Sequence, residues 1–221
     1  MEHTVRILHI GFVTHDVRQF IVTRPDGFEY RPGQGVEIAV DQDGWREEGR
    51  PFTPTSPAAA PTLEFTIKGY PEHEGVTRKL HSLKPGAALR MSEAFGTITY
   101  RGPGTFVAGG AGITPFLAIL RQLKEDGERG DCTLLFSNKT PADVICEKEL
   151  SHLMGDRLHL TCTERSAPGH DSVRIDRSFL EAKEVDVDQP FYLCGPPPFV
   201  EEIREALKEM GADPEAIVVE E

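Results

Sequence analysis

The segment Gly109-Gly110-Ala111-Gly112-Ile113-Thr114-Pro115 lies between an apolar run and a helical pattern. Small residues such as Gly110 and Gly112 let backbone N–H groups approach a pyrophosphate, and the N-terminus of the next helix favours negative charge. Thr114 is expected to cap that helix, with Pro115 in its first turn, where no N–H is needed. Taken alone, this segment fits a tight structural turn as well as a cofactor site, because proline replaces the last glycine of the usual fingerprint.

A second segment, Cys194-Gly195-Pro196-Pro197-Pro198-Phe199, follows the apolar run 191–193. In an open parallel sheet, ligands bind beyond the carboxyl ends of the strands. Cys194, Gly195 and Pro196 are therefore expected on the same rim as the glycine segment. The alternative is a buried cysteine before a proline turn.

A third segment, Arg50-Pro51-Phe52-Thr53-Pro54-Thr55-Ser56, combines three useful side-chain types. Arginine offers a planar fork for phosphate oxygens, an aromatic ring stacks on a flat heterocycle, and a hydroxyl bonds a ring nitrogen. A flavin dinucleotide site needs all three. The alternative is a proline-rich surface loop.

Together and in this order, the three segments resemble the ferredoxin–NADP reductase superfamily, in particular its cytochrome b5 reductase-like and flavodoxin reductase-like branch. Residues 50–53 match the R-x-[YF]-[ST] box, residues 109–115 resemble G-G-x-G-I-T-P, and residues 194–198 resemble C-G-P-P-P. The resemblance extends over nearly the whole chain. It implies an enzyme that takes a hydride from NAD(P)H onto FAD and passes the electrons to a separate acceptor, such as ferredoxin, flavodoxin or a cytochrome.

The resemblance also implies roles for individual residues. Arg50, next to Pro51, would contact the FAD pyrophosphate, and Phe52 would stack on the isoalloxazine without the hydroxyl of the family's tyrosine. Thr53 and Cys194 are the catalytic candidates: Thr53 would hydrogen-bond near flavin N5, and Cys194 would shape the nicotinamide pocket. Further FAD contacts would come from the following residues: Gly75, Val76, Thr77, Lys68 and Tyr70. Glu74 replaces an expected glycine beside them, and for Lys68 and Tyr70 an ordinary strand role is the alternative.

The segment Thr161-Cys162-Thr163-Glu164-Arg165 follows a predicted strand where relatives meet the adenosine ribose. An acid there bonds the ribose hydroxyls of NAD, whereas arginine favours the 2′-phosphate of NADP. Glu164 stands beside Arg165, and Arg174 and Arg177 follow, so both nucleotides are possible with a slight lean to NADH. Exposed loop charges are the alternative for Arg174 and Arg177.

The secondary-structure elements expected to position these residues follow two different patterns, one in each half of the chain. Short alternating or β-branched runs separated by turn residues predict an antiparallel β-barrel or sandwich for the first half, with strands at 5–13, 20–22, 35–40, 63–68 and 97–100 and a short helix at 76–83. The second half alternates strands at 105–108, 132–136, 158–163 and 191–194 with helices near 116–123, 142–153 and 199–210, which predicts a parallel α/β sheet. The predicted domains are 1–101, which would bind FAD, and 102–221, which would bind the nicotinamide nucleotide.

Charge, cysteine spacing and hydropathy argue against several classes of partner and site. A net charge of −12 argues against nucleic acid as a partner. The four cysteines are too far apart for an iron–sulfur or zinc site, and no histidine pair suggests a metal. No stretch is long and apolar enough to span a membrane and no secretion signal is visible, so a cytoplasmic protein is expected. The oligomeric state is left open, and an electron-transfer or nucleotide-binding subunit that acts only within a larger complex is the alternative function.

Overall fold

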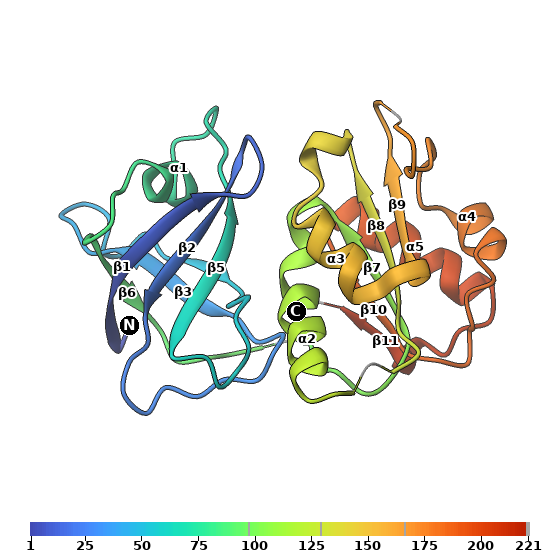
Figure 1. Cartoon of the computed structure of the whole chain (residues 1–221), viewed down its shortest axis with the longest axis horizontal. Coiled ribbons are helices and arrows are strands. Elements are labelled where there is room, and N and C mark those ends of the chain that lie inside the picture. Colours follow the sequence, from blue (N-terminus) through green and yellow to red (C-terminus); the bar gives the residue numbers. More distant parts are fainter. Residues whose placement is uncertain (97, 129, 166, 220–221) are drawn as a thin grey trace.

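The structure is a computed structural model that describes residues 1–221 apart from 97, 129, 166 and 220–221. Two domains lie side by side, an antiparallel β domain formed by the first half of the chain and an α/β domain formed by the second (Figure 1). The two fold classes predicted from the sequence are confirmed.

The first domain is a six-stranded near-barrel in which every strand pair is antiparallel. Its sheet order is β4-β3-β6-β1-β2-β5. An isolated antiparallel bridge between Pro54 and Phe65 joins the chain after one edge strand to the other edge, so the sheet curls almost closed. The strands are β1 (His3–Phe12), β2 (Val17–Thr23), β3 (Val36–Val40), β4 (Arg50–Phe52), β5 (Thr62–Lys68) and β6 (Ala88–Met91).

Alternation along the strands builds the barrel core. On β5, Leu63, Phe65 and Ile67 are each at most 3% exposed and pack in one cluster, as expected when one face of a pleated strand is covered. The short helix α1 (Val76–His81) closes one end of the barrel, because Val76 and Leu80 belong to the same cluster.

The second domain is a five-stranded parallel sheet of order β11-β10-β7-β8-β9. Its strands are β7 (Thr105–Gly109), β8 (Thr133–Asn138), β9 (Leu158–Cys162), β10 (Phe191–Cys194) and β11 (Ile217–Val219). Its α-helices are α2 (Thr114–Glu125), α3 (Glu147–Met154), α4 (Arg177–Ala182) and α5 (Pro197–Glu209). Short 3-10 helices occur at η1 (Gly110–Ile113), η2 (Pro141–Asp143), η3 (Gly155–Arg157) and η4 (Pro214–Ala216).

Helices cover both faces of this sheet, so its central strands are apolar throughout. All five residues of β7 are buried: Phe106 packs in the cluster that holds α2 and α3, and Val107 packs in the cluster with α4 and α5. The first cluster also contains Val17 and Ile98 from the barrel side, so the apolar core continues across the boundary between the domains.

Several predicted elements differ from the structure. Residues 98–100 form no strand, and Thr97 lies outside the described residues. The helix expected over 142–153 is interrupted because Cys146 has a left-handed φ of 54°, so that η2 and α3 are separate. β4, β6, β11 and α4 were not predicted. No helix within the described residues combines the length and hydropathy that a bilayer crossing requires.

Candidate functional site

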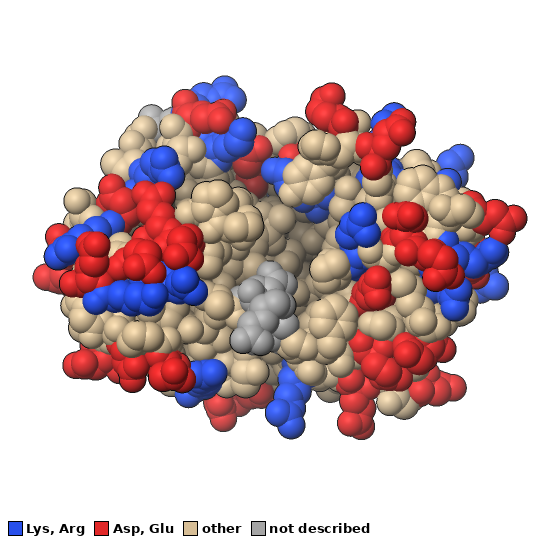
Figure 2. Space-filling view, turned by 180° about the vertical axis from the view of Figure 1, so that it is seen from behind, with Lys and Arg blue, Asp and Glu red and all other residues tan. Residues whose placement is uncertain are grey.

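A cleft of about 640 Å³ lies where the two domains meet. Figure 2 shows a hollow between the two halves, with most acidic side chains of that face on the outer flanks. Both domains contribute residues to its walls. The lining is made of Pro51, Phe52, Thr53, Thr66, Ile67, Lys68, Tyr70, Thr77, Gly109, Gly110, Ala111, Gly112, Thr114, Ser137, Asn138, Lys139, Asp143, Thr163, Cys194, Gly195, Pro196 and Phe199.

The barrel wall of the cleft presents side chains. Phe52 ends β4 and is half-buried against the barrel core, and the next residue, Thr53, is 7% exposed. Tyr70, just after β5, is 44% exposed and stands edge-on to His73. Two rings and a hydroxyl on one wall suit a flat heterocycle with hydrogen-bonding ring nitrogens.

The second wall consists mainly of backbone. Gly110 has a left-handed φ of 54°, which favours glycine. A Cβ atom at Gly112 would lie only 2.3 Å from the carbonyl oxygen of Cys194 and 2.6 Å from the amide nitrogen of Gly195. The glycine loop and the Cys194 turn thus pack backbone against backbone, so two of the segments predicted to share one rim do meet.

The strand register explains why these distant segments meet. Ala108, one residue before the end of β7, is paired with Cys194 at the end of the parallel strand β10. Both strands therefore deliver their following loops to the same edge of the sheet. Gly195 and Pro196 continue from there into α5, and all three residues of this turn line the cleft.

The predicted capping role of Thr114 is wrong. Ile113 occupies the N-cap position of α2, and the Thr114 hydroxyl donates to the carbonyl oxygen of Ala111 at 3.1 Å. The 3-10 turn of η1 carries the chain into the helix, so Thr114 is already helical and Pro115 follows it within the first turn. Thr114 lines the cleft, and the buried Pro115 does not belong to its lining.

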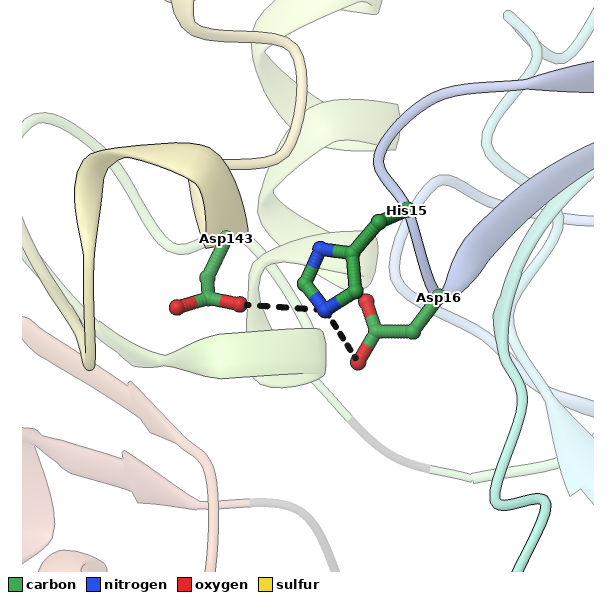
Figure 3. A group of neighbouring side chains, drawn as sticks. All are labelled: His15, Asp16 and Asp143. Carbon is green, nitrogen blue, oxygen red and sulfur yellow. Dashed lines mark ion pairs between the residues drawn. The ribbon is translucent and has the colours of Figure 1, made fainter.

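A group of polar, ionisable residues bridges the two domains at the edge of the cleft (Figure 3). His15, in the loop between β1 and β2, places Nε2 3.8 Å from Oδ1 of Asp143 and 3.9 Å from Oδ2 of Asp16. The ammonium group of Lys68 is 3.0 Å from Asp16 Oδ2. Burial raises the pKa of Asp16, but hydrogen bonds from Lys68 and Thr14 outweigh it, so its pKa lies below the usual value. Three potential metal ligands lie within 4.8 Å here, yet Lys68 already supplies a cation, and we interpret the group as an ion-pair cluster.

Some predicted residues do not line the cleft. Arg50 is exposed on β4, its Nη1 donates to the carbonyl oxygen of Gly49 at 2.6 Å, and no carboxylate of the described residues lies within 4.0 Å of it. Gly75 is the N-cap of α1 and Val76 is its first residue, and the next residue, Thr77, does reach the lining.

The residues predicted to read the ribose lie beside the cleft. Glu164 is exposed and pairs with Lys139, a lining residue, at 3.2 Å, and the amide of Arg165 donates to the Lys139 carbonyl. Arg174 lines an adjoining hollow of about 230 Å³ that shares Ser137, Thr163 and Phe199 with the cleft. Arg174 is paired with Glu202 at 2.9 Å, and Arg177 pairs with Glu181 and Glu209.

Sequence reasoning missed part of the lining. Ser137 and Asn138 are the last two residues of β8, Lys139 follows them, and Asp143 lies further along in η2. The rule that ligands bind at the carboxyl ends of parallel strands, applied to Cys194, would have found them, because β8 lies next to β7. Asn138 is 6% exposed, and neither its Nδ2 nor its Oδ1 has a hydrogen-bond partner among the described residues.

Comparison with known proteins agrees with this architecture. Residues 4–100 match the oxidoreductase FAD-binding domain, and residues 106–205 match the oxidoreductase NAD-binding domain. NADH-cytochrome b5 reductase 1 of Bos taurus is 30% identical over 243 aligned residues, covering 90% of this chain and 79% of that protein. The chain belongs to the ferredoxin–NADP reductase-like superfamily. The resemblance inferred from the three segments is confirmed.

Other members of this superfamily are similar over the same length. The glycine betaine monooxygenase reductase subunit of Chromohalobacter salexigens is 28% identical over 228 residues, covering 96% of this chain. The chain spans only 61% of that protein's length. A ferredoxin NADP+ reductase from Neisseria gonorrhoeae, solved with bound FAD and NADP, has a TM-score of 0.81 at 22% identity, covering 95% of this chain and 91% of that one, and it shows the common fold. The chain therefore joins an FAD-binding domain to a domain for NAD(P)H.

Proposed function

We propose that the protein is an FAD-dependent NAD(P)H oxidoreductase that passes electrons to a separate acceptor. One observation carries this proposal: a single cleft is bounded by the wall of the FAD-binding domain and by the glycine loop of the NAD-binding domain. We place the domains at 1–101 and 102–221. When bound, FAD supplies the two-electron acceptor chemistry that no amino-acid side chain provides.

The barrel wall fits a flavin. Phe52 and Tyr70 offer ring faces, and Thr53 offers a hydroxyl at the cleft surface. Arg50, which has no carboxylate partner among the described residues, keeps its charge available for a phosphate group just outside the cleft. Lys68, Gly75, Val76 and Thr77 border the same wall, and we assign them supporting contacts to FAD.

The α/β wall fits a dinucleotide. Gly110 and Gly112 keep the loop free of side chains at the start of α2, where backbone N–H groups favour a pyrophosphate. The unsatisfied carboxamide of Asn138 indicates that a polar ligand belongs beside it. Thr53 and Cys194 lie on opposite walls and are the residues that we assign to the nicotinamide and flavin rings. Their role is to orient the two rings and exclude water.

Local charges favour NADH over NADPH. The acid Glu164 is beside the rim residue Lys139, whereas the charge of Arg174 is partly offset by Glu202. A 2′-phosphate would have to compete with Glu202 for Arg174. Arg165 is exposed in the same loop, and no ion pair to it is found among the described residues, so it is the side chain that would bind NADPH if that nucleotide is used.

The acceptor is proposed to be a ferredoxin, a flavodoxin or a cytochrome, or the oxygenase partner of a reductase subunit. The second candidate, a subunit active only within a complex, is favoured by the similarity to the reductase subunit of glycine betaine monooxygenase. Turnover of the isolated protein separates these candidates. With FAD and NADH, a free reductase reduces ferricyanide continuously, whereas a complex-dependent subunit reduces its own flavin once and then stops.

The cofactor assignment is tested by reconstitution. Protein stripped of flavin should bind FAD with quenching of flavin fluorescence, because the isoalloxazine stacks on an aromatic ring. Arg50→Gln should weaken that binding, while its loop neighbour Arg46→Gln should not. If the stripped protein leaves the fluorescence of FAD unchanged, the assignment of the barrel wall is wrong.

A further inference from the structure

Arg121 is a largely buried charged residue on α2. Its side chain is only 14% exposed, and its neighbours Leu117 and Leu120 on the helix are buried. In Figure 1, α2 lies on the side of the α/β domain that faces the barrel. A buried charge is costly unless it is paired and hydrogen-bonded, so an arginine here needs partners.

The guanidinium group of Arg121 joins three elements. Its Nη1 donates to Glu64 Oε1 on β5 at 2.6 Å and to the carbonyl oxygen of Thr55 at 2.7 Å. Its Nε and Nη2 donate to both carboxylate oxygens of Glu149 on α3 at 2.7 and 2.8 Å. Burial alone lowers the pKa of Arg121, but Glu149 and Glu64 outweigh it and raise the pKa, so the group stays charged.

Both barrel partners of Arg121 are tied to the barrel wall of the cleft. The Thr55 hydroxyl donates to Glu64 Oε1 at 2.7 Å, and the Thr55 amide donates to the Glu64 carbonyl at 2.7 Å. Thr55 follows Thr53 by two residues, and Glu64 precedes Thr66 by two, and both Thr53 and Thr66 line the cleft. The Arg121 partners thus hold the segment that presents Thr53.

On the other side, α2 begins at the glycine loop. The helix carries Thr114 at its start and Arg121 two turns further along. Two turns of α-helix are rigid. The contact of Arg121 with the barrel therefore also fixes the position of the glycine loop relative to the barrel wall. The next residue, Gln122, adds a second bond to the same barrel segment, since its Oε1 accepts from the amide of Ala58 at 2.9 Å.

We propose that Arg121 is a positioning residue that fixes the spacing of the two cleft walls and so aligns the nicotinamide with the flavin. This inference rests on the proposed function. It requires arginine rather than lysine, because a planar fork can hold Glu64, Thr55 and Glu149 at once and a single ammonium cannot. The His15 bridge differs, since His15 is 63% exposed and its contacts are 3.8 Å or longer.

The test compares Arg121→Met, which keeps the aliphatic stem, with Arg121→Lys and with the control Arg157→Met. Arg157 belongs to the same domain, is 48% exposed and bonds only Asp131 among the described residues. Each FAD-loaded variant is mixed anaerobically with NADH, which yields the limiting rate of flavin reduction and the apparent dissociation constant for NADH. Small-angle X-ray scattering of the nucleotide-free protein reports the spacing of the domains, and thermal unfolding shows which variants are folded.

Arg121→Met is expected to slow flavin reduction by about 10- to 100-fold, because small misplacements of reacting groups have effects of that size. The dissociation constant for NADH and the FAD content should stay close to wild type, and the radius of gyration should increase. Arg121→Lys should recover part of the rate, and Arg157→Met should match wild type. If Arg121→Met fails to fold, Glu64→Gln, which keeps the shape of the partner, should also slow flavin reduction, but by a smaller factor.

A merely structural role predicts a different result. Folded Arg121→Met or Glu64→Gln with a wild-type rate of flavin reduction and an unchanged radius of gyration would overturn the inference. Failure of the wild type itself to be reduced by NADH or NADPH would instead reject the proposed function, so the two failures are distinguishable.

Discussion

The two walls of the cleft are built on different principles. The barrel wall offers side chains, with Phe52, Thr53 and Tyr70 projecting from the ends of antiparallel strands. The α/β wall offers mostly backbone, with the glycine loop packed directly on the Cys194 turn. Side-chain contacts can be removed one at a time, whereas a close backbone contact fails as soon as one carbon atom is added. Substitutions on the two walls should therefore separate flavin binding from nucleotide binding.

The largest effect is expected from Gly112→Ala. Its Cβ would meet backbone atoms of Cys194 and Gly195 at 2.3 to 2.6 Å, so the loop must move away from the turn. Overpacking of this kind costs about 1–3 kcal/mol of stability. If the same free energy is needed to restore the loop to its binding geometry, the affinity for NADH falls by about 5- to 150-fold. Titration of flavin reduction against NADH measures it. FAD content should not change, and Gly11→Ala, where the nearest atom is 3.4 Å away, is the control.

A loss of similar size is expected from Arg50→Gln on the barrel side. Loss of a charge-assisted hydrogen bond of about 1.5–3 kcal/mol weakens FAD binding by about 10- to 150-fold, and NADH-dependent reduction of the flavin that remains bound should keep its rate. Fluorescence titration with FAD provides the measurement. Equal FAD affinity in Arg50→Gln and the control Arg46→Gln would remove Arg50 from the phosphate site.

Thr53→Ala should act on rate more than on binding. One neutral hydrogen bond is worth about 0.5–1.5 kcal/mol, so flavin reduction should slow by about 2- to 12-fold while the melting temperature stays near that of wild type. Thr53→Ser keeps the hydroxyl and should retain the rate. Thr53 has no part in the reaction if Thr53→Ala is reduced as fast as wild type in rapid-mixing experiments.

Phe52→Tyr tests the same wall with a substitution that should strengthen FAD binding. The added hydroxyl can bond the flavin, so the affinity for FAD should increase by at most about 10-fold. Equilibrium dialysis of FAD with both proteins measures the change. Weaker FAD binding by Phe52→Tyr would show that the ring lies too close to its neighbours to accept a hydroxyl.

The smallest effect concerns the ion pair between Arg121 and Glu149, which lies within the α/β domain. The hydrogen bond from Arg121 lowers the pKa of Glu149 below its ordinary value of 4.5. The resulting stability is therefore complete above pH 4.5 and is lost as the pH falls through the lower pKa of the folded protein. Glu149→Gln should lower the melting temperature by about 2–4 °C at pH 7, and the difference should shrink in acid. A difference that grows toward low pH would contradict this sign, and the exposed Glu72→Gln is the control.

Much of the architecture followed from the sequence because local signals and the fold agree. The apolar runs of β7 and β10 are buried on both faces, and the residues after each run lie at the carboxyl edge where ligands bind. The glycine segment and the Cys194 segment could therefore be placed on one rim from the sequence, whereas residues 50–53 were assigned to the same site only by the family resemblance. Confirmation of the superfamily rests on the matches to residues 4–100 and 106–205.

What could not be predicted depends on long-range packing. Arg121 looks like an ordinary helix charge until Glu64 and Thr55 are brought beside it by the barrel. The break at Cys146 arises because this residue adopts a left-handed φ that no local proline or glycine announces. Thr114 has the side chain of a helix cap, but the preceding 3-10 turn already occupies that place. None of these contacts has a signal within its own stretch of sequence.

The most direct test of the central claim is an anaerobic absorbance spectrum of the FAD-supplemented protein, recorded before and after adding NADH and then, separately, NADPH. If the two walls hold one flavin and one nicotinamide together, the flavin bands should bleach within one turnover, faster with NADH than with NADPH. Bound flavin that stays oxidised with both nucleotides would contradict the claim that the cleft joins a nicotinamide to the flavin.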